Sequence, residues 1–267
     1  MSIITATYNA AHTLRQSMAS LDSQDTSVEH IVVDGVSTDS TLGILNDFGA
    51  SVSRIVSEPD RGLYDALNKG IKLSEGDVVG ILHADDFYAS PRVLGFVSEV
   101  FQDNSVDSCY GDLVYVADSF GKTNTEKSSR VVRYWSSGEY RAGRFYWGWM
   151  PPHPTFFVRR SIYEKYGFFN LDMGTAADYE LMLRFLLKYK ISCSYIPEVL
   201  VCMRTGGVSN ASWGNRFRAN RMDRKAWEVN GLTPYPWTIP LKPVRKIPQW
   251  WRSCPVPITN GNAIPPS

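Results

Sequence analysis

Two adjacent carboxylates, Asp85 and Asp86, end the apolar part of the segment Gly76–Tyr88 (GDVVGILHADDFY). The run Val78–Leu82 within this segment predicts a strand that is buried on both faces. Two carboxylates repel a phosphate group, but a divalent cation bridges carboxylate and phosphate oxygens. The pair therefore predicts a Mn²⁺ or Mg²⁺ site for a substrate phosphate, with Asp85 and Asp86 as the metal ligands.

Polar side chains also follow the other predicted strands of the first half, at Tyr8, Asp34 and Asp60. In an open α/β sheet, ligands bind outside the carboxyl ends of the strands. Taken singly, Asp34 and Asp39 are explained as turn residues, and Asp60 as the cap of the helix that follows it. Because all of these positions fall at one edge, a binding site is the better interpretation. The chain has no GxGxxG motif after the first strand and no Walker A motif, so a bound nucleotide would need another way to neutralise its diphosphate.

Strands and helices alternate through the first part of the chain, which predicts a parallel sheet covered by helices. The expected strands are residues 2–7, 30–34, 54–57 and 78–82, and the expected helices are residues 12–21, 40–48 and 63–71. The fold class is therefore α/β, with a Rossmann-like, mostly parallel sheet flanked by helices.

The rhythm changes after Tyr88. The patterns predict strands at 108–117, 155–158 and 199–203 and helices at 93–101, 162–166, 176–189 and 213–229. Residues 118–129 are expected to form a loop or an exposed hairpin. Beyond Gly231 the chain is rich in proline and poor in pattern, which predicts an extended tail.

Composition excludes several classes of protein. The 28 Lys and Arg residues nearly balance the 27 Asp and Glu residues, so a nucleic-acid partner is not expected. Four cysteines without a CxxC pair are typical of reduced thiols in a cytoplasmic protein. We expect no signal peptide, because the first apolar run is short, and no stretch approaches the roughly 18 apolar residues of a membrane span.

Four ordered motifs resemble those of the family 2 glycosyltransferases, which have the GT-A fold. They are TATYN (5–9), VVDGVSTDST (32–41), SEPDRGLYDALNKGI (57–71) and GDVVGILHADD (76–86), and the resemblance extends over roughly residues 1–205. It implies an inverting enzyme with a nucleotide-sugar donor. Within these motifs it implies donor-binding roles for Thr5, Tyr8, Asp34, Asp60, Arg61, His83 and Asp85. Tyr8 would stack near the base, Asp34 would contact base or ribose, and Asp85 would be the final, metal-binding acid of the DxD motif.

The chain departs from the family pattern at two places. Many relatives carry two acids where this sequence has Asp34 and Gly35, and His83 replaces the first acid of DxD. An imidazole at this position could fill space, bond to ribose or ligate Mn²⁺, and we place the first two roles ahead of the third. The QxxRW motif of the processive members is absent, which argues against a cellulose or hyaluronan synthase.

Asp178 is the candidate general base. It lies in the segment TAADYELMLR (175–184), which resembles the family's D-Y-[DE]-L-x-L-R segment and its catalytic acid. The alternative is a capping box formed by Thr175 and Asp178. An acid on the apolar stripe of a helix is unusual, so the catalytic interpretation is favoured. In it, Asp178 accepts the proton of the acceptor hydroxyl. Glu180 is expected to be structural.

Four further residues have both a functional and a structural interpretation. His153 could reach the diphosphate or the metal, or it could lie in the core or in a loop. Arg204 could meet the diphosphate, or it could be a surface residue. Trp147 and Trp149 could stack on an acceptor sugar, or pack in the core.

Together these observations predict transfer of a hexose, glucose or galactose, from a UDP-sugar. The motifs at 32–41 and 57–71 resemble most those of bacterial enzymes of O-antigen and exopolysaccharide assembly. This resemblance implies a polyprenyl-diphosphate-linked saccharide as acceptor and a role in lipopolysaccharide or exopolysaccharide synthesis at the inner face of the plasma membrane. Residues 1–105 would form the donor half, residues 106–231 the acceptor and catalytic half of the same domain, and residues 232–267 a Pro-rich tail. The alternatives are a nucleotidyltransferase and a sugar- or nucleotide-binding protein without activity. The tail interleaves Trp and Lys or Arg residues, so it would contact the membrane, or pack on its own domain or on a second subunit of a homo-oligomer.

Overall fold

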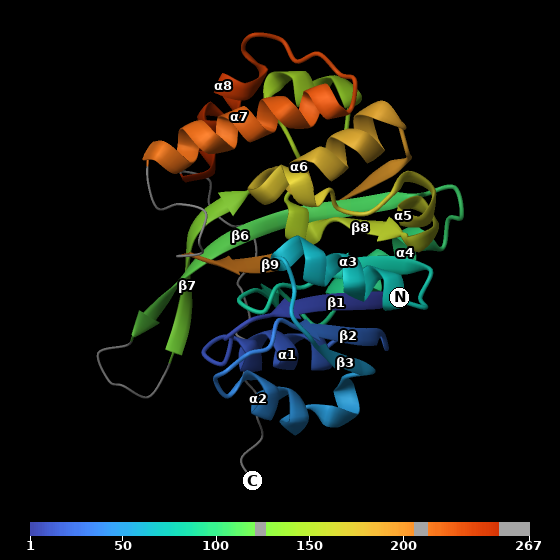
Figure 1. Cartoon of the computed structure of the whole chain (residues 1–267), viewed down its shortest axis with the longest axis vertical. Helices are drawn as coiled ribbons and strands as arrows, with labels where there is room; N and C mark the ends of the chain where they lie inside the picture. Colours follow the sequence, from blue (N-terminus) through green and yellow to red (C-terminus); the bar gives the residue numbers. More distant parts are fainter. Residues whose placement is uncertain (121–126, 206–212, 251–267) are drawn as a thin grey trace.

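A computed structural model of the chain describes residues 1–120, 127–205 and 213–250 (Figure 1). Over these residues one nine-stranded sheet runs through the molecule in the order β3-β2-β1-β4-β8-β6-β9-β5, and β7 pairs with β6. Helices α1 and α2 lie at one end of the molecule, and α6, α7 and α8 gather at the opposite end (Figure 1).

The first half is the predicted parallel α/β unit. Strands β1, β2, β3 and β4 pair in parallel, and β1 lies between β2 and β4. The order of the chain therefore reverses beside β1, the kind of position where open α/β sheets bind ligands. The elements are β1 (Ser2–Thr7), α1 (Leu14–Asp22), β2 (Glu29–Asp34), α2 (Thr41–Asp47), η1 (Gly49–Ser51), β3 (Arg54–Ser57), α3 (Leu63–Leu73) and β4 (Val78–Ile81).

Burial explains why these segments form a two-sided sheet. All six residues of β1 are buried, and so are all four of β4. Helix α3 lies close against β1 because Gly70 has no side chain: a Cβ at this position would come 2.3 Å from a methyl group of Ile4. This close contact near the C-terminal end of α3 holds the helix, which carries residues of the 57–71 motif, against β1.

The second half is mixed. Strand β8 pairs antiparallel with β4 and β6, whereas β9 runs parallel to β6 and antiparallel to β5. The expected hairpin forms, since β6 pairs antiparallel with β7, and residues 121–126 lie outside the described part. The elements are β5 (Phe87–Tyr88), α4 (Val93–Phe101), β6 (Ser108–Phe120), β7 (Lys127–Trp135), η2 (Ala142–Trp147), η3 (His153–Thr155), β8 (Phe157–Arg159), α5 (Arg160–Tyr166), η4 (Leu171–Ala176), α6 (Ala177–Met182), a π-helical turn η5 (Leu183–Lys188) and β9 (Cys193–Arg204).

The prediction of an extended tail is wrong for residues 238–250. After α7 (Trp213–Val229), the chain forms α8 (Thr238–Val244) and η7 (Ile247–Trp250). Ile239 joins Trp227 of α7 in the main hydrophobic core. Burial of this apolar side chain outweighs the poor helix propensity of a Pro-rich stretch. Residues 251–267 lie outside the described part, so the membrane or subunit contact expected of this end of the tail is not tested.

Two smaller sequence expectations concern thiols and membrane spans. Cys109 and Cys193 are free thiols, as expected, and Cys254 lies outside the described residues. Among the residues that the structure describes, no helix has both the length and the apolar character needed to cross a bilayer.

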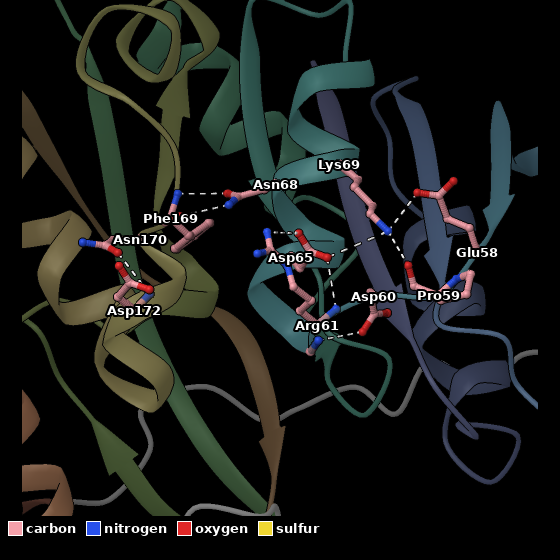
Figure 2. Close-up of polar contacts among 11 residues, drawn as sticks. Glu58, Pro59, Asp60, Arg61, Asp65, Asn68, Lys69, Phe169, Asn170 and Asp172 are labelled. Carbon is pink, nitrogen blue, oxygen red and sulfur yellow. Dashed lines mark hydrogen bonds and ion pairs between the residues drawn. The ribbon is translucent and has the colours of Figure 1, made fainter.

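One side chain joins the two halves of the sheet. The amide of Asn68, buried in α3, donates to the carbonyl of Phe169 at 2.9 Å and accepts from its N–H at 2.9 Å. Figure 2 shows this pair between α3 and the segment that leads to η4. The bonds span 101 residues of sequence, so Asn68 positions the chain shortly before Asp178.

Replacing Asn68 with Leu should destabilise the protein by about 2–4 kcal/mol, because two buried backbone groups of Phe169 lose their partners at nearly unchanged volume. Urea unfolding followed by circular dichroism measures the change. Asn46, exposed on α2, is the matched control. Asn46→Leu should change the unfolding free energy by less than about 0.5 kcal/mol. Equal effects of the two substitutions would contradict the joining role.

Candidate active site

Asp34, at the end of β2, is the centre of a hydrogen-bond cluster and not an exposed ligand. It is 0% exposed. Its Oδ1 accepts from the hydroxyls of Thr7 at 3.0 Å and Ser37 at 2.5 Å, and its Oδ2 from Ser37 N–H at 3.0 Å and the Ser57 hydroxyl at 2.8 Å. Burial raises the pKa of Asp34, but these hydrogen bonds outweigh it and hold the pKa below its ordinary value. Each oxygen accepts two hydrogen bonds, so Asp34 fixes the loops around it, and its expected contact with base or ribose stays a prediction.

The loops after β1 and β2 are bonded to each other. Asn9 Oδ1 accepts the N–H of Thr38 at 2.8 Å, and Asn9 N–H donates to Ser37 Oγ at 2.8 Å. Asn9 and Val36 have positive φ angles of 49° and 64°. For a β-branched residue such as Val36 this conformation is strained, and strain of this kind concentrates at functional sites. The structure therefore holds this edge of the sheet in a defined shape.

Tyr8, Gly35 and Asp60 lie at the same edge, where Tyr8 is exposed and Gly35 and Asp60 are half-buried. A Cβ added at Gly35 would lie 2.5 Å from Asp60 Oδ2 and 3.4 Å from the Tyr8 ring. The glycine thus leaves room for the Asp60 carboxylate where many relatives carry a second acid. Asp60 Oδ1 also accepts the N–H of Gly62 at 2.7 Å, so it is held in place beside the exposed Tyr8 ring. Tyr8 and Asp60 are brought together as the sequence predicted.

The rest of the 57–71 motif fixes this loop. Figure 2 shows Lys69 reaching back from α3, where its Nζ donates to the Pro59 carbonyl at 2.7 Å and lies 2.8 Å from the Glu58 carboxylate. Asp65 accepts the N–H of Arg61 at 3.0 Å. The Arg61 guanidinium lies 3.4 Å from Asp65 and remains largely exposed at the rim of the site.

Asp85 and Asp86, the two acids after β4, differ in burial. Asp85 is exposed, and none of the described residues donates a hydrogen bond to its carboxylate. Asp86 is 1% exposed, and its Oδ1 accepts the N–H of Arg204 in β9 at 3.3 Å. Burial, and secondly the charge of Asp85, raise the pKa of Asp86 well above its ordinary value.

This geometry bears on the predicted metal site. The Asp86 carboxyl group is buried, with Oδ1 on the N–H of Arg204 in β9 and with no hydrogen bond to Oδ2 from the described residues, and its assignment as a second metal ligand stays a prediction. Asp85 fits a cation that takes a single protein carboxylate and completes its shell with phosphate and water oxygens, as Mg²⁺ does. No group of three His, Cys, Asp or Glu side chains within the described residues is arranged to hold an ion by itself.

A row of rings crosses from α3 to the end of β4. The Tyr64 and Phe169 ring centroids are 5.2 Å apart, those of Phe169 and His153 5.5 Å, and those of His153 and His83 5.7 Å. Burial lowers the pKa of both His83 and His153 to about 4, so each imidazole is neutral at pH 7. His153 therefore has the packed position that its structural interpretation predicted, and His83 lies half-buried between it and Asp85.

Asp178 lies beside this row. Its Oδ1 accepts the N–H of Tyr179 at 2.7 Å, and its charge acts on Tyr64 and His83. Burial raises the pKa of Asp178, while the Tyr179 N–H, Lys242 and His83 oppose that rise. A half-buried carboxyl with a raised pKa suits a general base. The capping-box alternative is wrong, because helix α6 begins after Ala176 without a side-chain cap.

Lys242 is a residue that sequence reasoning did not place in the site. Its Nζ lies 2.6 Å from Asp223 Oδ2 and 3.4 Å from the centre of the Tyr179 ring, next to Asp178. The Tyr179 hydroxyl in turn accepts from Trp227 Nε1 at 2.9 Å. Helices α7 and α8 thus form one wall of the site. In the sequence, Lys242 is a lysine without an acidic neighbour in the Pro-rich stretch. This feature is equally typical of an exposed surface lysine.

Several candidates have structural roles. Thr5 is buried in β1, where its hydroxyl lies 3.0 Å from His30 Nε2, so its side chain is turned away from the exposed edge. Trp149 is buried in the core, whereas Trp147 is exposed. Glu180 is structural as expected: it pairs with Arg184 at 3.1 Å.

Arg204 lies beside the site, where it contacts other residues of the protein. Its N–H donates to Asp86, its guanidinium bonds to Gln16, and its Cζ lies 5.5 Å from the centre of the Phe87 ring. These contacts tie β9 to α1 and β5.

The fold is shared with solved glycosyltransferases of the GT-A class. The chain superposes on S. aureus TarS residues 1–349 in complex with UDP-GlcNAc with a TM-score of 0.66 and 18% identity, covering 86% of this chain and 65% of that one. It superposes on glucosyl-3-phosphoglycerate synthase from Mycobacterium tuberculosis, in complex with Mn²⁺, UDP and glucosyl-3-phosphoglycerate, with a TM-score of 0.58 and 16% identity, covering 87% and 80%. The chain thus spans less than two thirds of TarS 1–349.

The sequence family is more specific than the fold. Residues 2–167 match the model of glycosyl transferase family 2, and the chain belongs to this family, as the motifs predicted. An uncharacterised glycosyltransferase of M. tuberculosis is 31% identical over 189 residues, which cover 69% of this chain and 68% of that protein. A PGL/p-HBAD biosynthesis glycosyltransferase of M. tuberculosis is 28% identical and covers 81% of each chain. The succinoglycan biosynthesis protein ExoU of Rhizobium meliloti is 28% identical, covering 74% of this chain and 61% of its own.

Removing the Lys242 charge should move the acid limb of the pH–rate profile to higher pH. Asp178 is faced by Tyr64, His83, Lys242 and Lys246, and the Lys242 charge opposes the rise of its pKa. Lys242→Met removes that opposition, so the carboxylate is lost at a higher pH as the solution is acidified. The measurement is kcat against pH, with thermal melting at each pH to exclude unfolding.

Two variants serve as controls. Lys242→Arg keeps the charge and should keep the wild-type profile. Arg245→Met also removes a positive charge near the end of α8, where the Arg245 guanidinium donates to the Trp147 carbonyl at 3.2 Å. This substitution should leave the pH–rate profile unchanged. An unshifted profile for Lys242→Met would show that Lys242 only stabilises the fold.

Proposed function

We propose that this glycosyltransferase transfers a hexose, glucose or galactose, from a UDP-sugar to a hydroxyl group of a lipid-linked saccharide, with inversion at the anomeric carbon. The observation that carries the proposal is the position of Asp178. A half-buried carboxyl with a raised pKa acts on the His83 imidazole, which also feels the charge of the exposed Asp85. Donor-binding groups and a base on one edge are what a single displacement requires.

Donor binding would use the exposed residues of the edge. The Tyr8 ring offers a face for the uracil base, and Asp60, held beside it, offers carboxylate oxygens to the ribose hydroxyls. Asp34 acts through its neighbours by fixing the loops that carry these groups. The exposed Arg61 guanidinium suits the diphosphate, because it is a planar cation with several donors.

Asp85 would hold a divalent cation against the diphosphate. Such an ion, when bound, neutralises the negative charge that develops on the leaving UDP. The Mn²⁺ in the glucosyl-3-phosphoglycerate synthase complex with UDP supports this choice of cofactor. His83 is neutral beside Asp85, so it is available to accept or donate one hydrogen bond to the donor.

The displacement itself would use Asp178. The acceptor oxygen attacks the anomeric carbon as Asp178 takes its proton, and the bond to the UDP oxygen breaks with its electron pair. The N–H of Tyr179 holds the Asp178 carboxylate in place. The raised pKa of Asp178 makes this carboxylate a stronger base. Attack from the face opposite the leaving group inverts the configuration.

The names of two relatives support a lipid or polysaccharide acceptor. One acts in PGL/p-HBAD biosynthesis, and ExoU acts in succinoglycan biosynthesis. We propose that the acceptor here is a saccharide on a polyprenyl diphosphate, in bacterial surface polysaccharide synthesis such as that of O-antigen, lipopolysaccharide or exopolysaccharide. The enzyme would then work at the inner face of the plasma membrane.

The test separates the role of Asp85 from that of Asp178. Asp178→Asn keeps the shape of the side chain but not its basicity, so it should bind UDP normally and lose kcat by a factor of about 10² or more. Asp85→Asn should weaken UDP binding in Mn²⁺, and EDTA should have the same effect on the wild type. Calorimetry with UDP and a donor-consumption assay measure the two effects.

Each outcome has a clear meaning. Wild-type kcat in Asp178→Asn would place the base elsewhere. UDP binding that is indifferent to both EDTA and Asp85→Asn would remove the metal from the proposal. A protein that binds UDP-sugars but turns over none of them would be a binding protein without activity.

A further inference from the structure

Helix α8 turns an apolar stripe toward solvent. Trp237 is the N-cap residue of α8, Pro240 and Val244 lie within α8, and Ile247 begins η7, so the stripe runs along the α8–η7 segment at spacings of three, four and three residues. All four are exposed, with 43% for Trp237, 51% for Val244 and 48% for Ile247. The opposite side carries Thr238, Ile239 and Lys242, which face the protein. The side chains of the stripe therefore do not contribute to the hydrophobic core.

Two further aromatic rings extend this stripe. The Trp237 ring lies 5.8 Å from the ring of Trp147 in η2 and 5.0 Å from the ring of Tyr235, and both neighbours are about half exposed. We call the set formed by Trp147, Tyr235 and the four stripe residues the outer α8 face. It contains five of the large apolar or aromatic side chains that are exposed among the described residues.

The outer α8 face is rigidly held. Thr238 Oγ1 donates to the Tyr146 carbonyl at 2.7 Å. Gly148 has φ +73°, and a Cβ there would come 2.7 Å from the backbone nitrogen of Lys242. Because η2 and α8 interlock through their backbones, the two tryptophans are presented together and do not depend on a loop.

The charges around the face have one predominant sign. Arg245 bonds to the Trp147 carbonyl, and the charges of Arg141 and Arg245 both act on Arg144. The acid near them is Glu139, which lies 3.9 Å from Arg141. No Asp or Glu occurs in the sequence after Glu228. An anionic surface would meet this face without repulsion from acids of the C-terminal segment.

We propose that the outer α8 face docks on the surface of an anionic lipid bilayer. Trp and Tyr side chains favour the membrane–water interface, and a helix with one apolar face and flanking cations lies in that plane. A protein partner would need no such combination of exposed tryptophans and a cationic border. The inference rests on the proposed function in one respect: a lipid-linked acceptor gives an enzyme with this face a reason to stay at the membrane.

The experiment uses the full chain and vesicles without acceptor. The wild type should co-sediment with vesicles of phosphatidylcholine and phosphatidylglycerol, and more weakly with phosphatidylcholine alone. The triple variant Trp237→Gln, Val244→Gln, Ile247→Gln should reduce the bound fraction by roughly tenfold or more. Arg141→Gln with Arg245→Gln should remove the preference for phosphatidylglycerol and its sensitivity to salt.

Ile55 and Tyr189 provide the matched control, because they are exposed apolar residues outside the outer α8 face. Ile55→Gln with Tyr189→Gln should bind vesicles like the wild type. All variants should keep the wild-type melting temperature and turn over a soluble acceptor analogue at the wild-type rate. Vesicle binding without any sugar transfer would leave the docking face in place and reject the proposed function.

Three results would overturn the inference. The first is a wild type that does not bind the anionic vesicles. The second is a triple variant that still binds them fully. The third is a wild type that is a dimer in sedimentation equilibrium and becomes a monomer in the triple variant without any vesicle binding, which would make the face a contact between two copies.

Discussion

The buried carboxylate of Asp34 is the interaction on which the donor edge depends. It accepts hydrogen bonds from β1 through Thr7, from β3 through Ser57 and from its own loop through Ser37. A buried charge is tolerated only when its oxygens are satisfied, so these three segments must meet at one point. The loops then have little freedom, and the exposed Tyr8 ring and the half-buried Asp60 carboxylate are held together beside Gly35. A residue that the family resemblance assigned to substrate thus also supports its neighbours.

The acceptor side is built by contacts between segments far apart in the sequence. The Asn68 side chain in α3 makes two hydrogen bonds to the backbone of Phe169, close to the helix that bears Asp178. From the other side, α7 and α8 bring Asp223 and Lys242 to Tyr179. Asp178 therefore lies between two supports of different origin, and its raised pKa is the balance of burial against nearby hydrogen bonds and charge. The C-terminal helices thus pack on the segment that bears Asp178 and are not an appendage to the domain.

The sequence predicted the elements better than the orientation of their side chains. Apolar runs located strands such as Val78–Ile81 because burial on both faces leaves a strong pattern. The same pattern says nothing of which carboxyl faces solvent: Asp85 and Asp86 are neighbours, yet the backbone of β9 captures only Asp86. Composition also misled at α8, where Pro240 and Pro243 predicted an extended chain. The helix forms there because Thr238 and Ile239 are buried against the domain, a tertiary effect without a local signal.

The central claim is a single displacement at this edge with Asp178 as its base. The most direct measurement is the proton NMR spectrum of the product formed from whichever UDP-α-hexose the enzyme consumes, recorded before any equilibration of the anomeric centre. The account predicts a β-linked product, because the acceptor oxygen enters opposite the leaving UDP. An α-linked product would contradict it, since retention requires a different attack geometry or a second displacement.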